Sequence, residues 1–406
     1  MVGRTVLILG GGIGGVVAAN ELRRRLGREH RVVVVDRSAQ HLFSPSLLWV
    51  MVGWRHPEQI TKDLRRMVIP GVEVVQAEIL NIDPAKQKAL MKAGELGYDY
   101  LVVALGAELA PEAVPGYVET AYNFFSLEGA VKLHSHLQVF DGGRVTVVVS
   151  ALPYKCPAAP YEAALLLQDF FRRRGLLGRV NLQVFTPEAL PMPVAGPVIG
   201  QALKSMLEER GIGFHPNTQL KSIDPARREL QFQGGATAGF DLLVAVPPHR
   251  PPQALSGSGL TNEAGWVPVD RRTLLTKYNN IYALGDVTSI TLPNGKFLPR
   301  AGAFAHAQAQ VVARHIAANI QGTRPEAEFD GAGYCWVEMG RGIAGFANGS
   351  FYAEPDPVVE LKRPGRMWHW GKVLFESYWM RGGLARLTSR WALALGSRLF
   401  GVSASF

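Results

Sequence analysis

A glycine-rich turn near the N-terminus restricts the fold of this chain more than any other feature. Residues 10–15 read GGGIGG and satisfy the pattern G-x-G-x-x-G. The turn follows an apolar strand expected at Val6–Leu9 and precedes a helix of small and apolar residues that ends at Gly27. A second buried strand, RVVVVD, ends at Asp36. This β–α–β pattern predicts a Rossmann-like dinucleotide-binding domain.

Each residue of this turn has a physical role in binding a dinucleotide. Gly10 permits a tight turn, Gly12 lets the backbone approach a pyrophosphate, and Gly15 lets helix and strand pack closely. Gly14 belongs to the same fingerprint, and the helix N-terminus supplies amide donors. The carboxylate of Asp36 is placed to accept a hydrogen bond from a ribose hydroxyl. The alternative is a purely structural glycine turn.

A second set of alternating strands and helices follows. Strands are expected at 144–153, 181–187, 240–252 and 280–290, and helices at about 160–174, 198–210 and 301–320. Two such alternations predict an α/β fold with two Rossmann-like domains rather than one sheet. We expect the first domain in two parts (1–115 and 256–325), the second at 116–255, and a C-terminal module at 326–406.

The first turn of the second unit differs from the first in composition. Residues 150–160 read SALPYKCPAAP, with three prolines and no glycine. Proline lacks a backbone N–H, so this turn is poorly suited to a second pyrophosphate. We therefore infer one tightly held dinucleotide and no NAD(P)H site.

The chain has only two cysteines among 406 residues, so it is not a disulfide scaffold. Cys156 lies between a strand and a helix and follows Lys155; helix amides and a neighbouring lysine favour a thiolate. Cys335 lies far downstream in a glycine-rich stretch. From the residues alone, two unrelated buried thiols are the alternative to a pair that acts together in redox chemistry.

The positive charge of the chain is concentrated in its last residues. The net charge is +9, and the segment from residue 361 onward has eight Lys or Arg and one acid. Leu384, Leu387, Trp391, Leu395 and Leu399 recur there at helical spacing, with Arg386, Arg390 and Ser397 off the stripe. The pattern predicts a basic amphipathic helix in a membrane interface. Packing on its own core or on a dimer partner is the alternative. Binding to nucleic acid is less favoured, because it would not involve the apolar stripe.

Membrane-spanning and export signals are not visible in the sequence. No apolar run reaches the ~18–20 residues that span a bilayer. No charged and apolar leader precedes the first strand, so the default location is cytoplasmic.

The chain resembles the sulfide:quinone oxidoreductase family and its relative, the flavoprotein subunit of flavocytochrome c sulfide dehydrogenase. The resemblance covers almost the whole chain. It rests on the following segments: the N-terminal fingerprint, FSPSLLWVMVGWRHPEQI (43–60), YLVVALGA (100–107), YKCPAAPYEAA (154–164), FDLLVAVPPHRPP (240–252), NIYALGDVTSI (280–290), LPRAGAFAHAQAQVVA (298–313), GAGYCWVEMG (331–340) and KVLFESYWM (372–380).

The resemblance implies FAD. It places Gly285 and Asp286 on the ribityl–pyrophosphate stretch, although an ordinary turn is the alternative. The family's covalent flavin attachments use cysteine, and neither cysteine is available for that, so we expect non-covalent FAD and no metal. The implied FAD-binding residues are Gly10, Gly12, Gly14, Gly15, Asp36, Arg37, Ser44, Pro45, Ala77, Ala104, Gly106, Gly285, Asp286 and, beside the isoalloxazine, Arg300, Ala301 and Gly302.

The resemblance also makes Cys156 and Cys335 a redox pair. Hydrosulfide attacks the oxidised pair, one cysteine becomes a persulfide, and the released thiolate, which we assign to Cys335, passes two electrons to the flavin and onward to a quinone. Glu162 is a candidate proton handler or, alternatively, a helix-cap partner. Lys372 matches a family lysine near flavin and quinone or is a solvated tail lysine. A third cysteine found in many members is missing near 122–126.

Further implications concern the quinone and the location. The residues implied to line a quinone pocket are Tyr334, Trp336, Phe346 and Phe375. We expect an FAD-dependent sulfide:quinone oxidoreductase on a peripheral (monotopic) site of the cell membrane, at its cytoplasmic face. The quinone, the sulfur acceptor and a homo-oligomeric state stay open.

Three other functions share parts of this pattern. A flavocytochrome c flavoprotein subunit would require export, a haem partner and no membrane tail. A type II NADH:quinone oxidoreductase shares the scaffold but not the proline-filled turn or the cysteine pair. A non-enzymatic FAD-carrying scaffold on membranes would leave the thiols structural.

Overall fold

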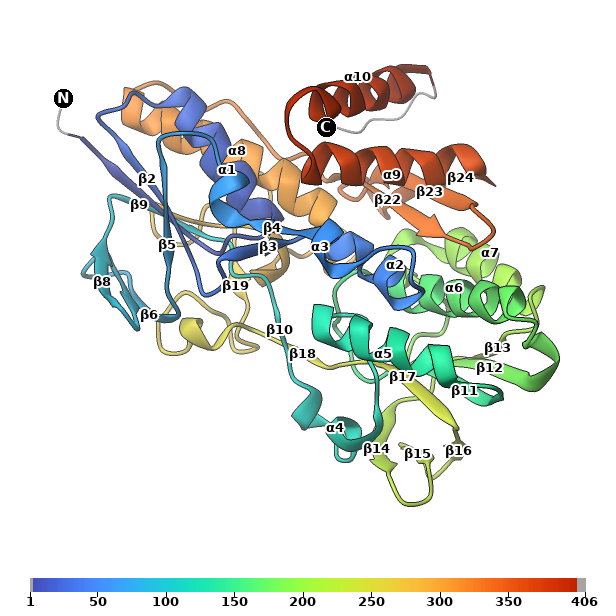
Figure 1. The fold of residues 1–406 in the computed structure, drawn as a ribbon. Helices are drawn as coiled ribbons and strands as arrows, with labels where there is room; N and C mark the ends of the chain where they lie inside the picture. Colours follow the sequence, from blue (N-terminus) through green and yellow to red (C-terminus); the bar gives the residue numbers. More distant parts are fainter. Residues whose placement is uncertain (1–2, 400–406) are drawn as a thin grey trace. The chain divides into compact units, whose positions relative to one another are not determined.

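The computed structural model describes residues 3–399 (Figure 1). The chain forms two compact units, each assembled from three segments. Unit 1 comprises Met1–Leu42, Thr61–Glu108 and Arg250–Ala332, and unit 2 comprises Phe43–Ile60, Leu109–His249 and Gly333–Phe406.

Unit 1 is built on a parallel five-stranded sheet with the order β20-β9-β1-β2-β5. Strand β2 (Arg31–Asp36) contains four consecutive valines, Val32–Val35, which are all buried. A strand buried on both faces requires cover on both sides, which is typical of parallel α/β sheets. Helices α1 (Ile13–Arg25) and α8 (Gly302–Gln321) pack against each other (Figure 1).

The other elements of unit 1 are short strands, hairpins and single turns. Their bounds, with those of the sheet, are β1 Thr5–Leu9, β2 Arg31–Asp36, β3 Gln40–Leu42, β4 Thr61–Asp63, η2 Leu64–Arg66, β5 Val72–Gln76, β6 Ile79–Asp83, β7 Lys88–Met91, β8 Gly94–Gly97, β9 Tyr100–Val103, η6 Gln253–Leu255, β19 Val267–Pro268, β20 Ile281–Ala283, η7 Gly285–Val287 and β21 Thr288–Ser289.

Unit 2 contains a second parallel sheet with the order β13-β12-β11-β17. Helix α6 (Ala159–Arg173) is buried over almost its whole length, so it is a core helix rather than a surface one. Its side chains share one hydrophobic core with β11, α7 and β17. Each fully buried Val or Leu of this core contributes about 1.5–3 kcal/mol of transfer free energy.

The C-terminal part of unit 2 is an antiparallel sheet, β22-β23-β24, followed by α9 (Arg366–Met380) and α10 (Gly383–Leu399). The sequence predicts a separate module at 326–406. In the structure, 333–406 groups with the second parallel sheet because Val337 and Met339 lie in the same core as α6.

Several short elements complete unit 2. Their bounds, with those of both sheets, are η1 Ser44–Ser46, α2 Leu47–Met51, α3 Pro57–Ile60, η3 Pro111–Ala113, α4 Tyr117–Thr120, α5 Leu127–Val139, β11 Gly143–Val149, η4 Leu177–Arg179, β12 Val180–Phe185, η5 Pro193–Ala195, α7 Pro197–Glu208, β13 Gly213–His215, β14 Leu220–Asp224, β15 Glu229–Phe232, β16 Thr237–Gly239, β17 Leu242–Val246, β22 Ala332–Glu338, β23 Ala344–Ser350 and β24 Val358–Gly365. The two-residue strands β10 (Glu108–Leu109) and β18 (His249–Arg250) lie where the chain passes between the units.

The predicted α/β class is confirmed, because both units hold a parallel sheet with helical connections. The helices expected at about 160–174 and 301–320 are α6 and α8, each displaced by one residue. Among residues 3–399, no helix combines the length and the apolar character that crossing a bilayer requires.

Candidate functional site

The predicted dinucleotide-binding residues of unit 1 gather at the carboxyl edge of its sheet. In a parallel sheet this edge is where ligands bind. The residues follow or end five different strands: Gly10 follows β1, Asp36 and Arg37 end and follow β2, Ala77 follows β5, Ala104 and Gly106 follow β9, and Gly285 and Asp286 follow β20.

The glycines of the turn are of two kinds. A Cβ on Gly15 would overlap the carbonyl oxygen of Gly10, and a Cβ on Gly14 would overlap the Leu284 side chain. A Cβ on Gly12, by contrast, meets no protein atom within 4 Å. Helix α1 begins after Gly12 without a side-chain cap and without an acid in its first turn. Open space above backbone amides is what a pyrophosphate needs, so these residues fit a dinucleotide.

Asp36 and His41 hold the turn in shape. Asp36 accepts hydrogen bonds from the Gly11 N–H at 2.6 Å and the Ser38 N–H at 2.7 Å. The His41 Nδ1 lies 2.9 Å from the Gly11 carbonyl oxygen. Burial lowers the pKa of His41, so its neutral ring donates to that oxygen. The expected contact of Asp36 with a ribose stays a prediction.

The residues expected beside the isoalloxazine lie at the start of α8. Arg300 stacks on Trp266, with its guanidinium carbon 3.9 Å from the ring centre, and its Nε–H donates to the Asp286 carbonyl at 2.9 Å. Burial lowers the pKa of Arg300, although the attraction of Asp286 opposes this. Ala301 precedes the helix and Gly302 begins it. Ser44 and Pro45 lie in η1, which groups with unit 2.

The two cysteines converge within unit 2. Cys156 lies between β11 and α6 with a left-handed φ of 55°, which is uncommon for a residue other than glycine. Cys335 lies on β22. Both are free thiols, and the Cys335 Sγ–H donates to the Trp336 carbonyl oxygen at 3.3 Å. Cys156 lies near enough to act on this thiol: its side chain, followed by burial, raises the pKa of Cys335 well above its ordinary value, and the Lys372 ammonium opposes the shift.

A buried ion pair lies beside these thiols. The Lys372 Nζ, on α9, is 3.2 Å from the Glu162 Oε1, on α6, and both side chains are almost fully buried. The Glu338 backbone N–H donates to the same Glu162 oxygen at 2.8 Å. Lys372 is therefore not a solvated tail lysine.

Burial acts on both partners of this pair. Burial raises the pKa of Glu162 above its ordinary value, while the Lys372 charge opposes the shift. Burial lowers the pKa of Lys372, but the attraction of Glu162, Glu338 and Cys335 outweighs it, so the pKa of Lys372 is raised. The charges of the pair therefore act on Cys335, which in turn acts on Lys372.

Two residues that our sequence analysis missed extend this cluster. The Glu338 side chain is fully buried, and both of its oxygens lie 3.0–3.1 Å from the His369 Nδ1. His369 lies one helical turn before Lys372 on α9 and contacts the rings of Trp49 and Trp54 at 5.9 and 5.8 Å. A signal was present: Glu338 is a charged residue in an otherwise buried strand, which requires a partner. We call Cys156, Cys335, Glu162, Lys372, Glu338 and His369 the dithiol cluster.

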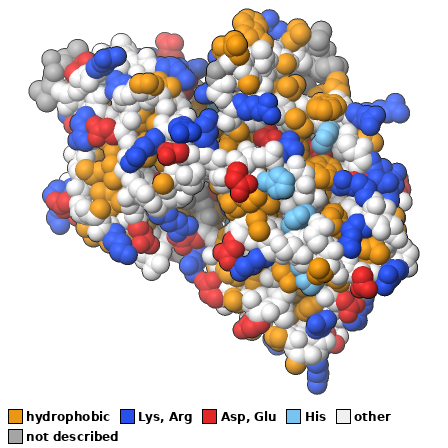
Figure 2. All heavy atoms as spheres, in the orientation of Figure 1, with side chains coloured by type: hydrophobic (Ala, Val, Ile, Leu, Met, Phe, Trp, Pro, Cys, Tyr) orange, Lys and Arg blue, Asp and Glu red, His pale blue; other side chains and the backbone are white. Residues whose placement is uncertain are grey.

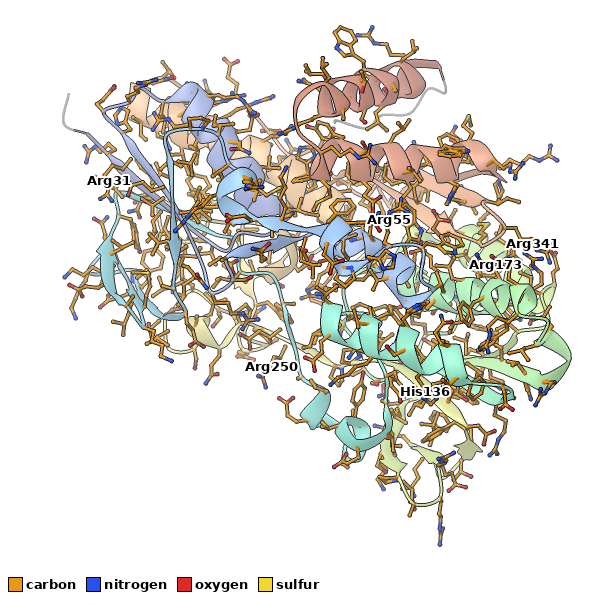
Figure 3. All side chains as sticks on the ribbon, viewed as in Figure 1. Arg31, Arg55, His136, Arg173, Arg250 and Arg341 are labelled. Carbon is orange, nitrogen blue, oxygen red and sulfur yellow. The ribbon has the colours of Figure 1, made fainter. Side chains whose placement is uncertain are left out.

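Two arginines, Arg55 and Arg173, which Figure 3 labels, stack on the two tryptophans of this region. Arg55 stacks on Trp49 at 4.6 Å and is paired with Glu376 at 2.7 Å. Arg173 stacks on Trp54 at 5.1 Å. The Lys372 ammonium lies 5.1 Å from the centre of the Trp49 ring, so that ring contacts three cations or potential cations.

The four residues expected to line a quinone pocket form one aromatic cluster. Tyr334 and Trp336 have ring centres 5.5 Å apart, and Trp336 contacts Phe346 at 5.2 Å and Phe375 at 5.1 Å. Side chains alternate across a strand, so Tyr334 and Trp336 face opposite to Cys335 on β22. Consistent with this, Cys335 packs on the α6 core. One strand thus separates thiol from aromatic side chains.

The C-terminal stripe is exposed in the structure. Leu384, Leu387, Trp391 and Leu395 are 80%, 53%, 76% and 60% exposed, and Leu393 and Ser389 face inward. The side chain of Leu399 lies outside the described residues. Figure 2 shows hydrophobic side chains with basic ones among them over α10, at the upper right. Such a surface suits a membrane interface, and the docking itself stays a prediction.

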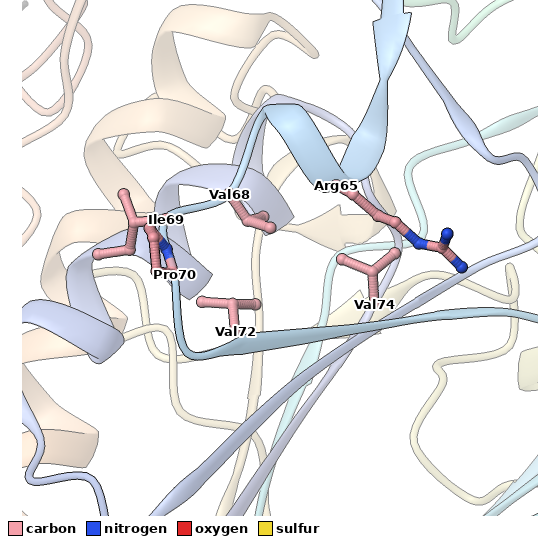
Figure 4. A pocket seen from close by; sticks show the side chains of 6 residues that line it. All are labelled: Arg65, Val68, Ile69, Pro70, Val72 and Val74. Atoms are coloured by element: carbon pink, nitrogen blue, oxygen red, sulfur yellow. The ribbon is translucent and has the colours of Figure 1, made fainter.

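A shallow hollow of about 370 Å³ lies in unit 1 between η2 and β5 (Figure 4). It is lined by Arg65 and by apolar side chains such as Ile69 and Val72. It includes no predicted site residue. Across residues 3–399, no group of three or more His, Cys, Asp or Glu side chains is arranged to hold a metal ion.

Comparison with known proteins finds related oxidoreductases. Residues 4–311 match the model of the pyridine nucleotide-disulphide oxidoreductase family. The mitochondrial sulfide:quinone oxidoreductase of Mus musculus is 29% identical, over 86% of this chain and 79% of that protein. The sulfide-quinone reductase of Aquifex aeolicus is 27% identical, over 92% and 90%. The X-ray structure of the sulfide:quinone oxidoreductase from Aquifex aeolicus superposes with a TM-score of 0.82 at 24% identity, over 92% and 90% of the two chains.

Proposed function

The chain belongs to the pyridine nucleotide-disulphide oxidoreductase family, and we propose that within it the chain acts as a flavin-dependent sulfide:quinone oxidoreductase. The observation that carries the proposal is the contact between Cys156 and Cys335, two thiols far apart in the sequence, beside a buried Glu162–Lys372 pair. The similarity to proteins named sulfide:quinone oxidoreductases over most of both chains supports the same activity.

The first chemical step takes place at sulfur. Hydrosulfide attacks the Cys156 sulfur of the oxidised pair, the Cys156–Cys335 S–S bond breaks, and a new S–S bond forms. Cys156 then carries a persulfide with the proton of the hydrosulfide, and Cys335 leaves as a thiolate. Lys372 stabilises that thiolate, because its charge is the one influence that lowers the pKa of Cys335.

FAD is the proposed cofactor, held non-covalently by the glycine turn of unit 1. When bound, it accepts the electron pair from the sulfur site and delivers it to a quinone. Gly12 leaves open space for its pyrophosphate, and Asp36 and Arg300 lie at the carboxyl edge of the same sheet. No flavin-attaching cysteine is available, because both cysteines belong to the pair.

The quinone and the membrane form the last part of the proposal. The aromatic cluster of Tyr334, Trp336, Phe346 and Phe375 offers flat apolar rings to a quinone head group. Exposed apolar and basic side chains on α10 support docking on the surface of a membrane that holds the quinone.

The test mixes the purified protein with sulfide or with NADH, without oxygen, and follows flavin absorbance. We expect bleaching by sulfide and none by NADH. Cys156→Ser and Cys335→Ser should each keep FAD and lose bleaching by sulfide, because neither can form the disulfide. Bleaching by NADH alone, or full reduction of the Cys335→Ser variant by sulfide, contradicts the proposal.

A further inference from the structure

His369 is the partly exposed end of an otherwise buried cluster. Its side chain is 18% exposed, whereas that of Glu338, which it bonds through Nδ1, has no exposure. One helical turn further along α9, Lys372 bonds the buried Glu162, and its charge acts on Cys335. A buried ion pair and a partly exposed imidazole therefore lie one turn apart on α9, and each of these groups can carry or accept a proton.

The negative charges of the cluster require a cationic side chain that can gain and lose its proton. Lys372 balances one carboxylate, Glu162, at 3.2 Å. The second carboxylate, Glu338, has the His369 ring as its side-chain partner. A hydrosulfide ion that enters adds another negative charge, and an uncompensated buried charge is strongly unfavourable. Imidazole is the side chain that gains and loses a proton near neutral pH.

We propose that His369, oriented by Glu338, exchanges protons between the sulfur site of the dithiol cluster and solvent. The inference rests on the proposed function. When hydrosulfide attacks the oxidised pair, its proton stays on the Cys156 persulfide. That proton leaves, and an electron pair passes to the flavin, when the persulfide sulfur bonds to the Cys335 sulfur. It passes to the Glu162–Lys372 pair, then to Glu338 and His369, and out.

An unpartnered donor supports water in this path. The Trp49 indole N–H is fully buried and has no hydrogen-bond partner among the residues that the structure describes. Buried donors without a partner are rare and are usually satisfied by an ordered water in polar surroundings. The Trp49 ring contacts both His369 and Lys372, so this donor belongs to a side chain that borders the cluster.

The two arginines that stack on the neighbouring tryptophans are already paired. Arg55, stacked on Trp49, bonds Glu376 at 2.7 Å, and Ser46 donates to the same carboxylate at 2.7 Å. Arg173, stacked on Trp54, is 3.3 Å from Asp169. Arginine does not release its proton in proteins. The outward transfer therefore falls to His369.

The experiment uses the flavin-loaded full chain with His369→Gln, which keeps a side-chain N–H donor for Glu338 but cannot exchange protons. We expect bleaching by sulfide to slow about tenfold or more, and added imidazole to restore it in proportion to its concentration. His136→Gln is the matched control, because His136 stacks on Tyr122 outside the cluster (Figure 3). It should react like the unchanged protein.

A second readout needs no sulfide. Alkylation of the reduced thiols by iodoacetamide should proceed at the same rate in His369→Gln as in the unchanged protein, which separates loss of proton exchange from a displaced cysteine. If alkylation changes and imidazole does not rescue, His369 has a structural role and the inference is wrong.

The unchanged protein provides a test that does not depend on folding of a variant. Treatment with diethyl pyrocarbonate should modify His369, slow bleaching by sulfide, and be reversed by hydroxylamine. Modification of His369, identified by peptide mass, without slower bleaching overturns the inference alone. An unchanged protein that sulfide never bleaches overturns the proposed function as well.

Discussion

The two units place opposite chemistry at the same topological position. In unit 1 the turn between β1 and α1 is a glycine turn that exposes backbone amides. In unit 2 the turn between β11 and α6 has prolines and presents Cys156 with a left-handed φ. Both turns follow the central strand region of a parallel sheet and precede a helix. The difference teaches that the fold supplies the position, while in the function we propose, glycine or cysteine at that position selects cofactor binding or sulfur chemistry.

The largest expected effect tests the glycine turn. Gly12→Val should leave unit 1 folded, because no protein atom lies near its Cβ, but should weaken flavin binding by at least ~100-fold. The measurement is the ratio of flavin to protein absorbance after purification. Gly178→Val, in unit 2 and equally open, is the control and should keep the flavin. Full flavin content in Gly12→Val would show that the turn does not hold the cofactor.

The next effect concerns the buried Glu162–Lys372 ion pair of unit 2. Lys372→Met leaves Glu162 as an unpaired buried carboxylate and should lower the free energy of unfolding by about 3–5 kcal/mol. Adding Glu162→Gln should recover a large part of this loss in denaturant titrations. Lys132→Met removes the exposed pair with Glu128 and should change nothing measurable. Equal losses of unfolding free energy in Lys372→Met and Lys132→Met would show that burial does not make the Glu162–Lys372 pair more important than an exposed pair.

The dependence of stability on pH should differ in sign between the units. Burial raises the pKa of Glu188 above 4.5, against the hydrogen bonds from Tyr161 and Tyr154. Its contribution is present below pH ~4.5 and is lost as pH rises through the raised pKa. The side-chain hydrogen bond from Arg31 lowers the pKa of Glu73 in unit 1, so its contribution is lost as pH falls (Figure 3). Comparing Glu188→Gln and Glu73→Gln with the unchanged protein from pH 3 to 7 should reveal opposite slopes, and parallel slopes would refute this assignment.

The smallest effect on stability is expected in the tail, which has no counterpart among the described residues of unit 1. Trp391→Ala, on the exposed face of α10, should change the free energy of unfolding by less than ~0.5 kcal/mol. It should nevertheless weaken binding to anionic lipid vesicles in a sedimentation assay. Leu393→Ala, buried on the same helix, should instead cost about 2 kcal/mol or more. Unchanged vesicle binding by Trp391→Ala would argue against a membrane-facing stripe.

Much of the fold could be read from the sequence because it depends on local patterns. The valine run of β2 and the glycines at 10–15 define the first unit without any distant contact. The meeting of Cys156 with Cys335, in contrast, depends on how β22 packs on the core around α6, and the resemblance rather than any spacing suggested it. The grouping of 333–406 with the second sheet was missed for the same reason.

Glu338 and His369 show what local reading overlooks. Glu338 lies three residues after Cys335 in an apolar strand, and His369 lies in a basic tail where a histidine attracts no notice. Their pairing is set by the packing of α9 on β23 and its neighbours, which no periodicity reports. Together with Lys372, Phe375 and Trp379, His369 does follow a helical spacing of three to four residues, and this was the available clue.

The alternation of side chains on β22 has a consequence for tolerance to insertions. Because Cys335 and its neighbours Tyr334 and Trp336 face opposite sides of one strand, a single inserted residue before position 334 would exchange them. The sulfur would enter the aromatic cluster and an indole would enter the α6 core. Lineages that carry this strand should therefore vary freely in the length of the loops around it but keep its residue count unchanged.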